Sequence, residues 1–158
     1  MTTPGRSRDG GRGGTLARVK LVFLGWTRFV VVLLVLQIGL AGWGAVSTGG
    51  ERIERFIVHA GNGGMLMFWL LLSTVLALIA RPGRKAVLLT ALSTFMIWMQ
   101  GALAYGFGTD GVPGGVGIAL HATNGLGVLL IQLAVARLAK RAVDAKRAEK
   151  ALAKAVPA

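Results

Sequence analysis

Four long runs without a charged residue dominate this chain. They cover residues 29–50, 56–80, 86–109 and 111–136. Each run is long enough to supply the ~20 apolar residues with which a helix crosses the hydrocarbon core of a bilayer. Inside lipid the backbone must satisfy its own hydrogen bonds, so we expect the runs to be helices. The sequence therefore predicts an all-α membrane protein with four transmembrane helices in an up-down-up-down bundle.

The composition agrees with this class. Of the 158 residues, 54% are hydrophobic and 15% are charged, against about 45–50% and about 25% in typical soluble domains. Cysteine is absent, which excludes a disulfide framework, a thiolate metal site and c-type haem attachment. A net charge of +12 would indicate nucleic acid as the partner of a soluble protein. Here the basic residues flank the apolar runs, where anionic lipid attracts them, so the expected partner is the bilayer and not nucleic acid.

The flanks of the runs predict the domain boundaries. Residues 1–17 show no periodicity and are expected to form a disordered cytoplasmic tail. Residues 18–140 are expected to form the bundle, with helices near residues 20–47, 56–80, 84–108 and 115–139. Residues 141–158 are expected to form a basic helix or tail that lies along the inner membrane surface or frays into the cytoplasm. The first run is too long for the core of a signal peptide, so it is expected to be retained.

The distribution of positive charge predicts the topology. Of the 18 lysines and arginines, only Arg52 and Arg55 lie in the two loops at residues 47–55 and 109–115. The others precede residue 29, lie in the turn at residues 81–85, or follow residue 136. The positive-inside rule therefore places both termini in the cytoplasm and the two poorly charged loops outside. Arg28, close to the cytoplasmic end of the first helix, is expected to extend its charge to the interface.

A short polar motif occurs twice. The segment HAGNGG at residues 59–64 returns as HATNGL at residues 121–126, and these segments contain the only two histidines. The spacing from His59 to His121 is 62 residues, and the spacing from Gln37 to Gln100 upstream is 63 residues. The matched spacing indicates that a two-helix unit was used twice in tandem.

The topology predicts where the two histidines lie. The second and fourth helices run in the same direction and are diagonal in such a bundle, so His59 and His121 are expected to face its axis at a common depth near the outer end. Gln37 and Gln100 on the other two helices are expected in the same layer. Ionisable groups at membrane depth default to a functional interpretation.

Three interpretations of this polar layer remain open. A haem between the imidazoles would use Gly63 and Gly125, one turn below each histidine, as clearance for its flat ring. In that case Asn62 and Asn124 would orient the imidazoles. The second interpretation is that the polar groups only hold helices together, which the glycines fit equally well. The third is a copper or zinc ion, which lacks a carboxylate ligand inside the bundle.

The charged loop before His59 has two interpretations as well. Arg52 and Arg55 are candidates to pair with haem propionates through charge-assisted hydrogen bonds. The alternative is a solvated pattern of charges that begins the second helix, together with Glu51 and Glu54. The roles of these acidic residues are not decided by the sequence.

The chain resembles one four-helix half of heme A synthase over residues 30–135. The resemblance lies in QIGL at residues 37–40, QGAL at residues 100–103 and ALH at residues 119–121. It implies axial ligation of haem iron by His59 and His121. That family has eight helices, an outer-loop cysteine pair and an arginine where this chain has Ala60, so haem hydroxylation is not implied. The chain also looks like small four-span membrane proteins of bacteria, which implies the bacterial cytoplasmic membrane.

The function expected from these features is that of a b-type membrane cytochrome. It would bind one haem b between the two histidines, for electron transfer or haem handling, with a redox partner or a second copy of the chain as possible associates. The alternative is a non-catalytic accessory or scaffold subunit whose polar layer only packs helices. A proton-coupled carrier ranks lowest, because the repeat is parallel and the spans contain no Asp or Glu. No catalytic constellation is present, so enzyme activity is left open, and redox chemistry is the only class expected.

Overall fold

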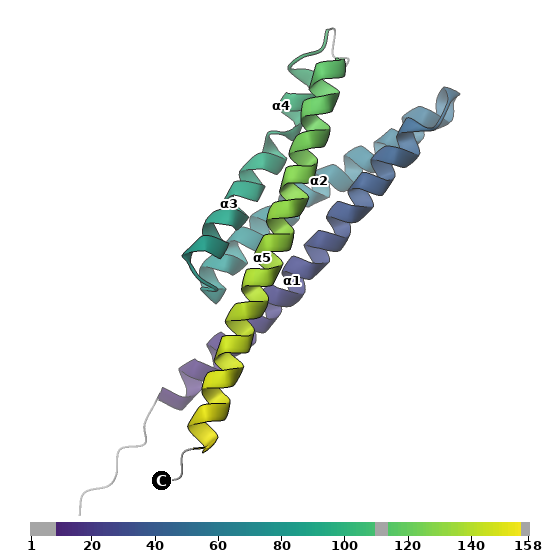
Figure 1. Cartoon of the computed structure of the whole chain (residues 1–158). Helices are drawn as coiled ribbons and strands as arrows, with labels where there is room; N and C mark the ends of the chain where they lie inside the picture. The colour runs from purple at the N-terminus through teal and green to yellow at the C-terminus, as the bar shows by residue number, and fades with distance from the viewer. Residues whose placement is uncertain (1–8, 110–113, 156–158) are drawn as a thin grey trace, which may run out of the picture.

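The computed structural model describes residues 9–109 and 114–155, which are almost entirely helical (Figure 1). The helices are α1 (Asp9–Ala45), α2 (Gly49–Ala80), α3 (Arg84–Trp98), α4 (Gln100–Tyr105) and α5 (Gly115–Ala155). Four segments are long and apolar enough to cross a membrane, and α3 with α4 forms the third of them, Arg84–Tyr105. The predicted all-α class with four candidate membrane helices is therefore confirmed, and it supports a multi-pass membrane protein.

The helices form a four-membered bundle in which neighbours along the chain are antiparallel (Figure 1). Helix α1 packs against α2 and α5, and α3 packs against the same two helices. Within the described residues no close backbone approach joins α1 to α3 or α2 to α5. The helices α2 and α5 are therefore diagonal across the bundle, and side chains on their inner faces meet at its axis.

One inward stripe on each helix makes the core. Buried residues recur at alternating spacings of three and four, which keeps them on one face of a helix. On α2 these positions are Leu66, Leu70, Ser73, Ala77 and Ala80. The opposite faces expose large apolar side chains such as Val32 and Leu130. A bundle that is apolar outside as well as inside suits a lipid environment.

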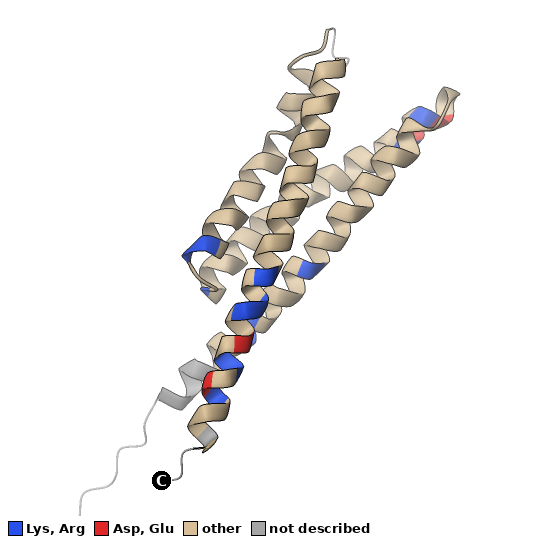
Figure 2. Ribbon diagram, in the orientation of Figure 1, with Lys and Arg blue, Asp and Glu red and all other residues tan. Residues whose placement is uncertain are grey.

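The stripes assemble into two apolar clusters. The middle cluster consists of Val30, Leu34, Leu66, Leu70, Ile97 and Val128. The second cluster consists of Phe23, Leu24, Ala77, Ala80, Val135, Ala139 and Val143. We call the end of the bundle beyond the second cluster the basic end, because most lysines and arginines gather there (Figure 2). The opposite end, where α2 and α5 begin, is the histidine end.

The two helix pairs diverge toward the histidine end. Figure 1 shows α1 and α2 leaning away from α4 and α5 there. The burial pattern agrees, since no large apolar side chain described beyond the middle cluster in that direction is buried. The apolar core therefore closes the bundle at its middle and at its basic end, and the histidine end is left to polar contacts.

Several helix boundaries differ from those predicted. Residues 9–17, expected to be disordered, belong to α1, because extending an existing helix adds a hydrogen bond per residue without a new nucleation step. Helix α2 begins at Gly49 rather than near residue 56, and an ion pair of 2.9 Å between Glu51 and Arg55 stabilises its first turns. The predicted outer loop at residues 47–55 is thereby reduced to a connection at residues 46–48.

The third span differs in detail from the prediction. A short interruption at Met99 separates α3 from α4, next to Gly101, whose residue type has low helix propensity. The C-terminal segment agrees with the predicted basic helix, since α5 continues straight past residue 140 to Ala155 (Figure 1). Ion pairs from Lys140 to Asp144 and from Lys146 to Glu149 support its last turns.

Two adjacent leucines on α2 test the position of the core. Leu70 is fully buried in the middle cluster, and Leu71 is 46% exposed. We expect Leu70→Ala to lower the free energy of unfolding by about 2–5 kcal/mol, because it leaves a cavity. Leu71→Ala, the matched control, should change it by much less. Thermal denaturation in detergent measures both, and equal losses would contradict the described core.

Candidate functional site

The structure brings the two histidines together at the axis of the bundle. The ring centroids of His59 on α2 and His121 on α5 are 6.1 Å apart, and the ring planes are inclined by 57°. Both residues are partly buried. Because α2 and α5 are diagonal, this ring contact crosses from one helix pair to the other at the level where the pairs begin to diverge.

Gln37 holds His59 within the first helix pair. The Nε2 atom of Gln37 donates to the backbone oxygen of His59 at 3.0 Å, and the Nδ1 atom of His59 lies 3.2 Å from the backbone oxygen of Gln37. Asn62 donates from Nδ2 to Oε1 of Gln37 at 2.6 Å. The contacts with α1 therefore hold the imidazole of His59 independently of the second helix pair.

Gln100 makes the matching contacts in the second helix pair. The Nδ1 atom of His121 lies 3.1 Å from the backbone oxygen of Gln100. With the side-chain amide of Gln100 oriented to suit its neighbours, its nitrogen donates to the backbone oxygen of His121 at 3.0 Å. Its oxygen then accepts from the backbone N–H of Gly125 at 3.1 Å. Amide orientation is assigned from such networks, since oxygen and nitrogen are otherwise hard to tell apart.

These contacts bear on the positions of the ring protons. A backbone carbonyl only accepts, so the Nδ1 atom of His59, which faces Gln37 O, carries the proton of that ring. At His121 the carbonyl of Gln100 and the amide N–H of Gln100, at 3.1 and 2.9 Å from Nδ1, favour opposite tautomers. The Nε2 lone pair of His59 is therefore on the side of the ring away from the Gln37 carbonyl. At His59 this lone pair faces Nε2 of Gln37 at 3.3 Å.

The two glycines below the histidines make room for the glutamines. A Cβ atom on Gly63 would lie 3.1 Å from Nε2 of Gln37, and one on Gly125 would lie 3.3 Å from the side-chain amide of Gln100. The sequence suggested that this clearance serves a flat cofactor. In the structure a glutamine amide fills it on each side, so the glycines are explained without a cofactor.

The asparagines differ between the two pairs. Asn124 donates to the backbone oxygen of Met96 at 2.8 Å and so joins α5 to α3. Asn62 instead bonds to the side chain of Gln37. Among the described hydrogen bonds neither asparagine reaches a ring nitrogen, so Asn62 orients its imidazole only through Gln37.

The arginines of the outer turn lie in a network of their own. Arg55 donates to Ser47 Oγ at 2.6 Å and to Glu51 Oε2 at 2.9 Å. Its guanidinium lies 4.7 Å from the ring centre of Trp43. This network was not predicted, although Trp43 and Ser47 sit four residues apart at the end of the first apolar run. It ties α2 to the end of α1 and occupies the cation that was a candidate for haem propionates.

Phe56 connects this turn to the histidine. Its ring meets that of His59 edge-on, with centroids 6.2 Å apart. A Cβ atom on Gly44 would lie 3.2 Å from the same phenyl ring, so the glycine admits it. The guanidinium of Arg52 lies over the ring of Phe56, 6.0 Å from its centre, and Arg52 is exposed. Glu54 is exposed too.

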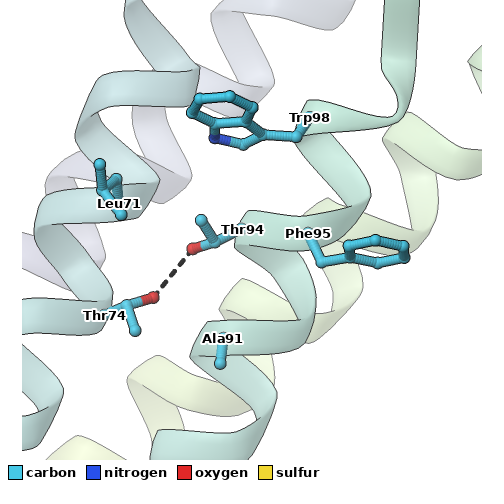
Figure 3. Close-up of a pocket in the computed structure, with 6 residues that line it drawn as sticks. All are labelled: Leu71, Thr74, Ala91, Thr94, Phe95 and Trp98. Atoms are coloured by element: carbon cyan, nitrogen blue, oxygen red, sulfur yellow. Dashed lines mark hydrogen bonds between the residues drawn. The ribbon is translucent and has the colours of Figure 1, made fainter. Parts of the chain in front are cut away.

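The structure also contains an open groove of about 570 Å³ on a different face, away from the histidines. Figure 3 shows its lining residues on α2 and α3, which are Leu71, Thr74, Ala91, Thr94, Phe95 and Trp98. The hydroxyls of Thr74 and Thr94 bond to each other at 2.9 Å, and each also contacts the backbone oxygen of Leu70. The polar groups of the groove are therefore already engaged, and its surface suits lipid chains.

The chain supplies few metal ligands. Within the described residues no group of three or more His, Cys, Asp or Glu side chains is close enough to hold a metal ion. Structural zinc needs four ligands and catalytic zinc three from the protein, so the pair of imidazoles does not suit either.

No protein-family model matches this chain, and no curated protein or solved structure is similar enough to match it.

Neighbouring glycines on α2 test the contact between Gly63 and Gln37. Relative to Gly64→Ala, we expect Gly63→Ala to lower the free energy of unfolding by about 1 kcal/mol, because the added Cβ displaces the amide of Gln37 and weakens its hydrogen bond to His59. Gly64 has open space where its Cβ would be. Gly64→Ala should therefore be neutral or stabilising by up to about 1 kcal/mol, as expected from helix propensity. Thermal unfolding of both variants checks the difference, and a Gly63→Ala protein as stable as Gly64→Ala would contradict the described packing.

Proposed function

We propose that this protein is a b-type cytochrome-like membrane protein that binds one haem b between His59 and His121. The observation that carries the proposal is the pair of imidazoles from diagonal helices, with ring centroids 6.1 Å apart. Because an imidazole nitrogen binds a metal at about 2 Å, two rings on opposite sides of one iron have centroids about 6 Å apart. The distance between the two ring centroids is in the range that axial ligation needs.

The small number of ligands favours haem over a bare metal ion. A porphyrin brings four nitrogen donors of its own and needs only two axial ligands from the protein. Two histidines are what this bundle offers at its axis. The resemblance to one half of heme A synthase over residues 30–135 adds to the proposal, because it places ligands at the same two positions.

Hydrogen bonding prepares both imidazoles for this role. Histidines that ligate metals commonly donate their other ring N–H to a backbone carbonyl or a carboxylate, which fixes the tautomer and the ring orientation. The carbonyl of Gln37 accepts that proton from His59, and haem ligation would require the same of the Gln100 carbonyl, which lies 3.1 Å from Nδ1 of His121. Binding at Nε2 of His59 requires the Gln37 amide to give up its contact with this nitrogen, while its bond to the His59 carbonyl can stay. Bound haem would supply one-electron redox chemistry, and the chain supplies ligands, orientation and burial.

The expected topology belongs to the same proposal. Both termini lie in the cytoplasm, and the histidine end faces outward, because positive charge is concentrated at the basic end (Figure 2). The matched Gln–His contacts of the two helix pairs support a tandem origin of the four helices. Haem would then lie near the outer face of a cytoplasmic membrane, where an external redox partner has access. Arg52, which has no ion pair among the described residues, stays a candidate for a propionate.

Absorption spectra test the ligand. Protein purified from haem-replete cells should show a Soret band, with sharp α and β bands after reduction, as expected for bis-histidine haem. His59→Ala and His121→Ala should each lose the low-spin spectrum. Thr123→Ala, an exposed change two residues from His121, is the matched control and should keep it. Wild-type protein that is folded and colourless would contradict the proposal.

An accessory or scaffold protein is the second candidate function. The bonds between glutamine and histidine lie within each helix pair, so they hold α1 to α2 and α4 to α5 without any cofactor. In membranes such bonds contribute about 0.6 kcal/mol on average. The scaffold interpretation therefore predicts colourless wild-type protein and a His59→Ala protein of nearly unchanged stability, which the same preparations reveal.

Reporter fusions test the topology. A green fluorescent protein fused to the C-terminus should fluoresce, because the positive-inside rule places this end in the cytoplasm. Alkaline phosphatase fused at the same point should be inactive. A second phosphatase fusion within residues 110–113 should be active. The opposite pattern would reverse the membrane orientation proposed for the haem site.

A further inference from the structure

A second layer of polar side chains lies inside the bundle, away from the histidines. Its members are fully buried and come from all four spans, and they are Thr27, Ser73, Thr90, Ser93 and Gln132. They lie on the inward stripes, between the middle apolar cluster and the cluster at the basic end. Nothing in the proposed haem site uses them. Polar groups this deep in a membrane bundle need partners, because lipid offers none.

Side-chain bonds between helices place these residues at one level. Trp26 on α1 donates to Ser73 Oγ on α2 at 2.9 Å. Thr74 and Thr94, each adjacent in sequence to a member of the layer, join α2 to α3 at 2.9 Å. Gln132 on α5 donates from Nε2 to Ser93 Oγ on α3. The layer therefore spans the whole cross-section of the bundle.

The hydroxyl protons of the layer are all directed at backbone carbonyls. Thr27 donates to Leu24 O at 3.0 Å, and Thr90 donates to Ala86 O at 2.7 Å. The two serines do the same, with Ser73 donating to Trp69 O and Ser93 to Thr90 O. A hydroxyl that has donated its proton can still accept. The inward side of the layer is therefore rich in acceptors and poor in donors.

Gln132 makes this imbalance costly. Its side chain is 0% exposed, and within the described residues its Oε1 atom has no hydrogen-bond partner. Turning the amide over does not help, because its NH₂ group would then lack an acceptor while its oxygen faced a serine that has already donated its proton. Leaving a buried acceptor unpaired costs free energy that replacement by an apolar side chain would avoid.

We propose that this layer is a binding site for a small neutral hydrogen-bond donor, a water molecule, which donates to Oε1 of Gln132. Buried waters typically bond to polar groups that are otherwise unsatisfied. A cation would also suit acceptors, but the layer contains no carboxylate among its described residues, and an uncompensated charge at this depth is expensive. The chemistry therefore selects a neutral donor.

Thr27 is the second acceptor for this water. Thr27 and Gln132 both belong to the fully buried layer. Helix α1 packs directly against α5. No hydrogen bond between Thr27 and Gln132 is described, and each has acceptor capacity left. A water that donates one proton to each oxygen would satisfy both.

A structure at a resolution that shows ordered water tests the proposal directly. We expect density for a water within hydrogen-bond distance of Gln132 Oε1 in crystals of the full-length protein. A dry, well-ordered layer at that resolution would overturn the proposal. A bound cation would show shorter contacts and anomalous or ion-dependent density, and it would equally overturn the assignment of a neutral donor.

Stability measurements give an independent test with a change of sign. Gln132→Met keeps the length and volume of the side chain and removes its polar atoms. If water satisfies Oε1, this change should lower the melting temperature in detergent. If the layer is dry, the same change removes an unpaired acceptor, which offsets the lost bond to Ser93 Oγ, and a melting temperature that stays or rises would overturn the proposal. Leu133→Met, a partly buried neighbour, is the matched control for introducing methionine.

A double-mutant cycle covers the case in which Gln132→Met lowers stability for another reason. Thr27→Val removes the hydroxyl on α1 and keeps the shape of the side chain. Because the two residues share one water, the loss in the double variant should be smaller than the sum of the single losses. Additive losses would show that no shared ligand couples them and would overturn the proposal.

Discussion

The structure depends on one constraint, that a polar group inside lipid must find its partner within the protein. The stripe of buried residues on each helix is apolar except at two levels, and at both levels the helices bond to one another. Gln37 and Gln100 donate to backbone carbonyls of the neighbouring helix at the histidine end, and Trp26 and Gln132 donate to serine hydroxyls of neighbouring helices in the central layer. Between and below these levels the apolar clusters close the bundle. The polar groups thus decide which helices are neighbours and in what register.

The sequence predicted the helices well and their ends poorly. Each apolar run is long enough to cross a bilayer, and in lipid a backbone without internal hydrogen bonds costs too much free energy. The runs therefore have to be helices, and the four candidate spans could be predicted from the positions of apolar and charged residues. Helix ends depend on smaller effects. Helix α2 begins about two turns earlier than predicted, at 3.6 residues per turn, and the Glu51–Arg55 pair is one of the small contributions in that stretch. The glycine-rich residues before residue 18 are helical because they extend a helix that forms further along the chain. No local sequence pattern predicts this extension.

The candidate site was predictable as a set of residues but not as a set of bonds. Matched spacing identified His59, His121, Gln37 and Gln100, because a repeated unit repeats its contacts. The sequence did not predict which groups pack against Gly63 and Gly125, because a glycine does not indicate what fills the space beside it. Arg55 was a candidate to bind a haem propionate because the sequence did not predict the short connection between α1 and α2. That connection brings Arg55 over the ring of Trp43. The sequence analysis did not select Gln132, because it is one polar residue in a long apolar run. Among the described buried side chains it is the one whose acceptor oxygen lacks a hydrogen-bond partner.

The divergence of the two helix pairs separates the imidazoles from the apolar core. Each ring is bonded within its own pair, and both apolar clusters lie to one side of the rings. The distance between the rings therefore depends on the angle between the two pairs more than on the packing of the interior. In a bilayer, the thickness and lateral pressure of the lipid would act on the diverging ends, and through them on how closely the two histidines approach.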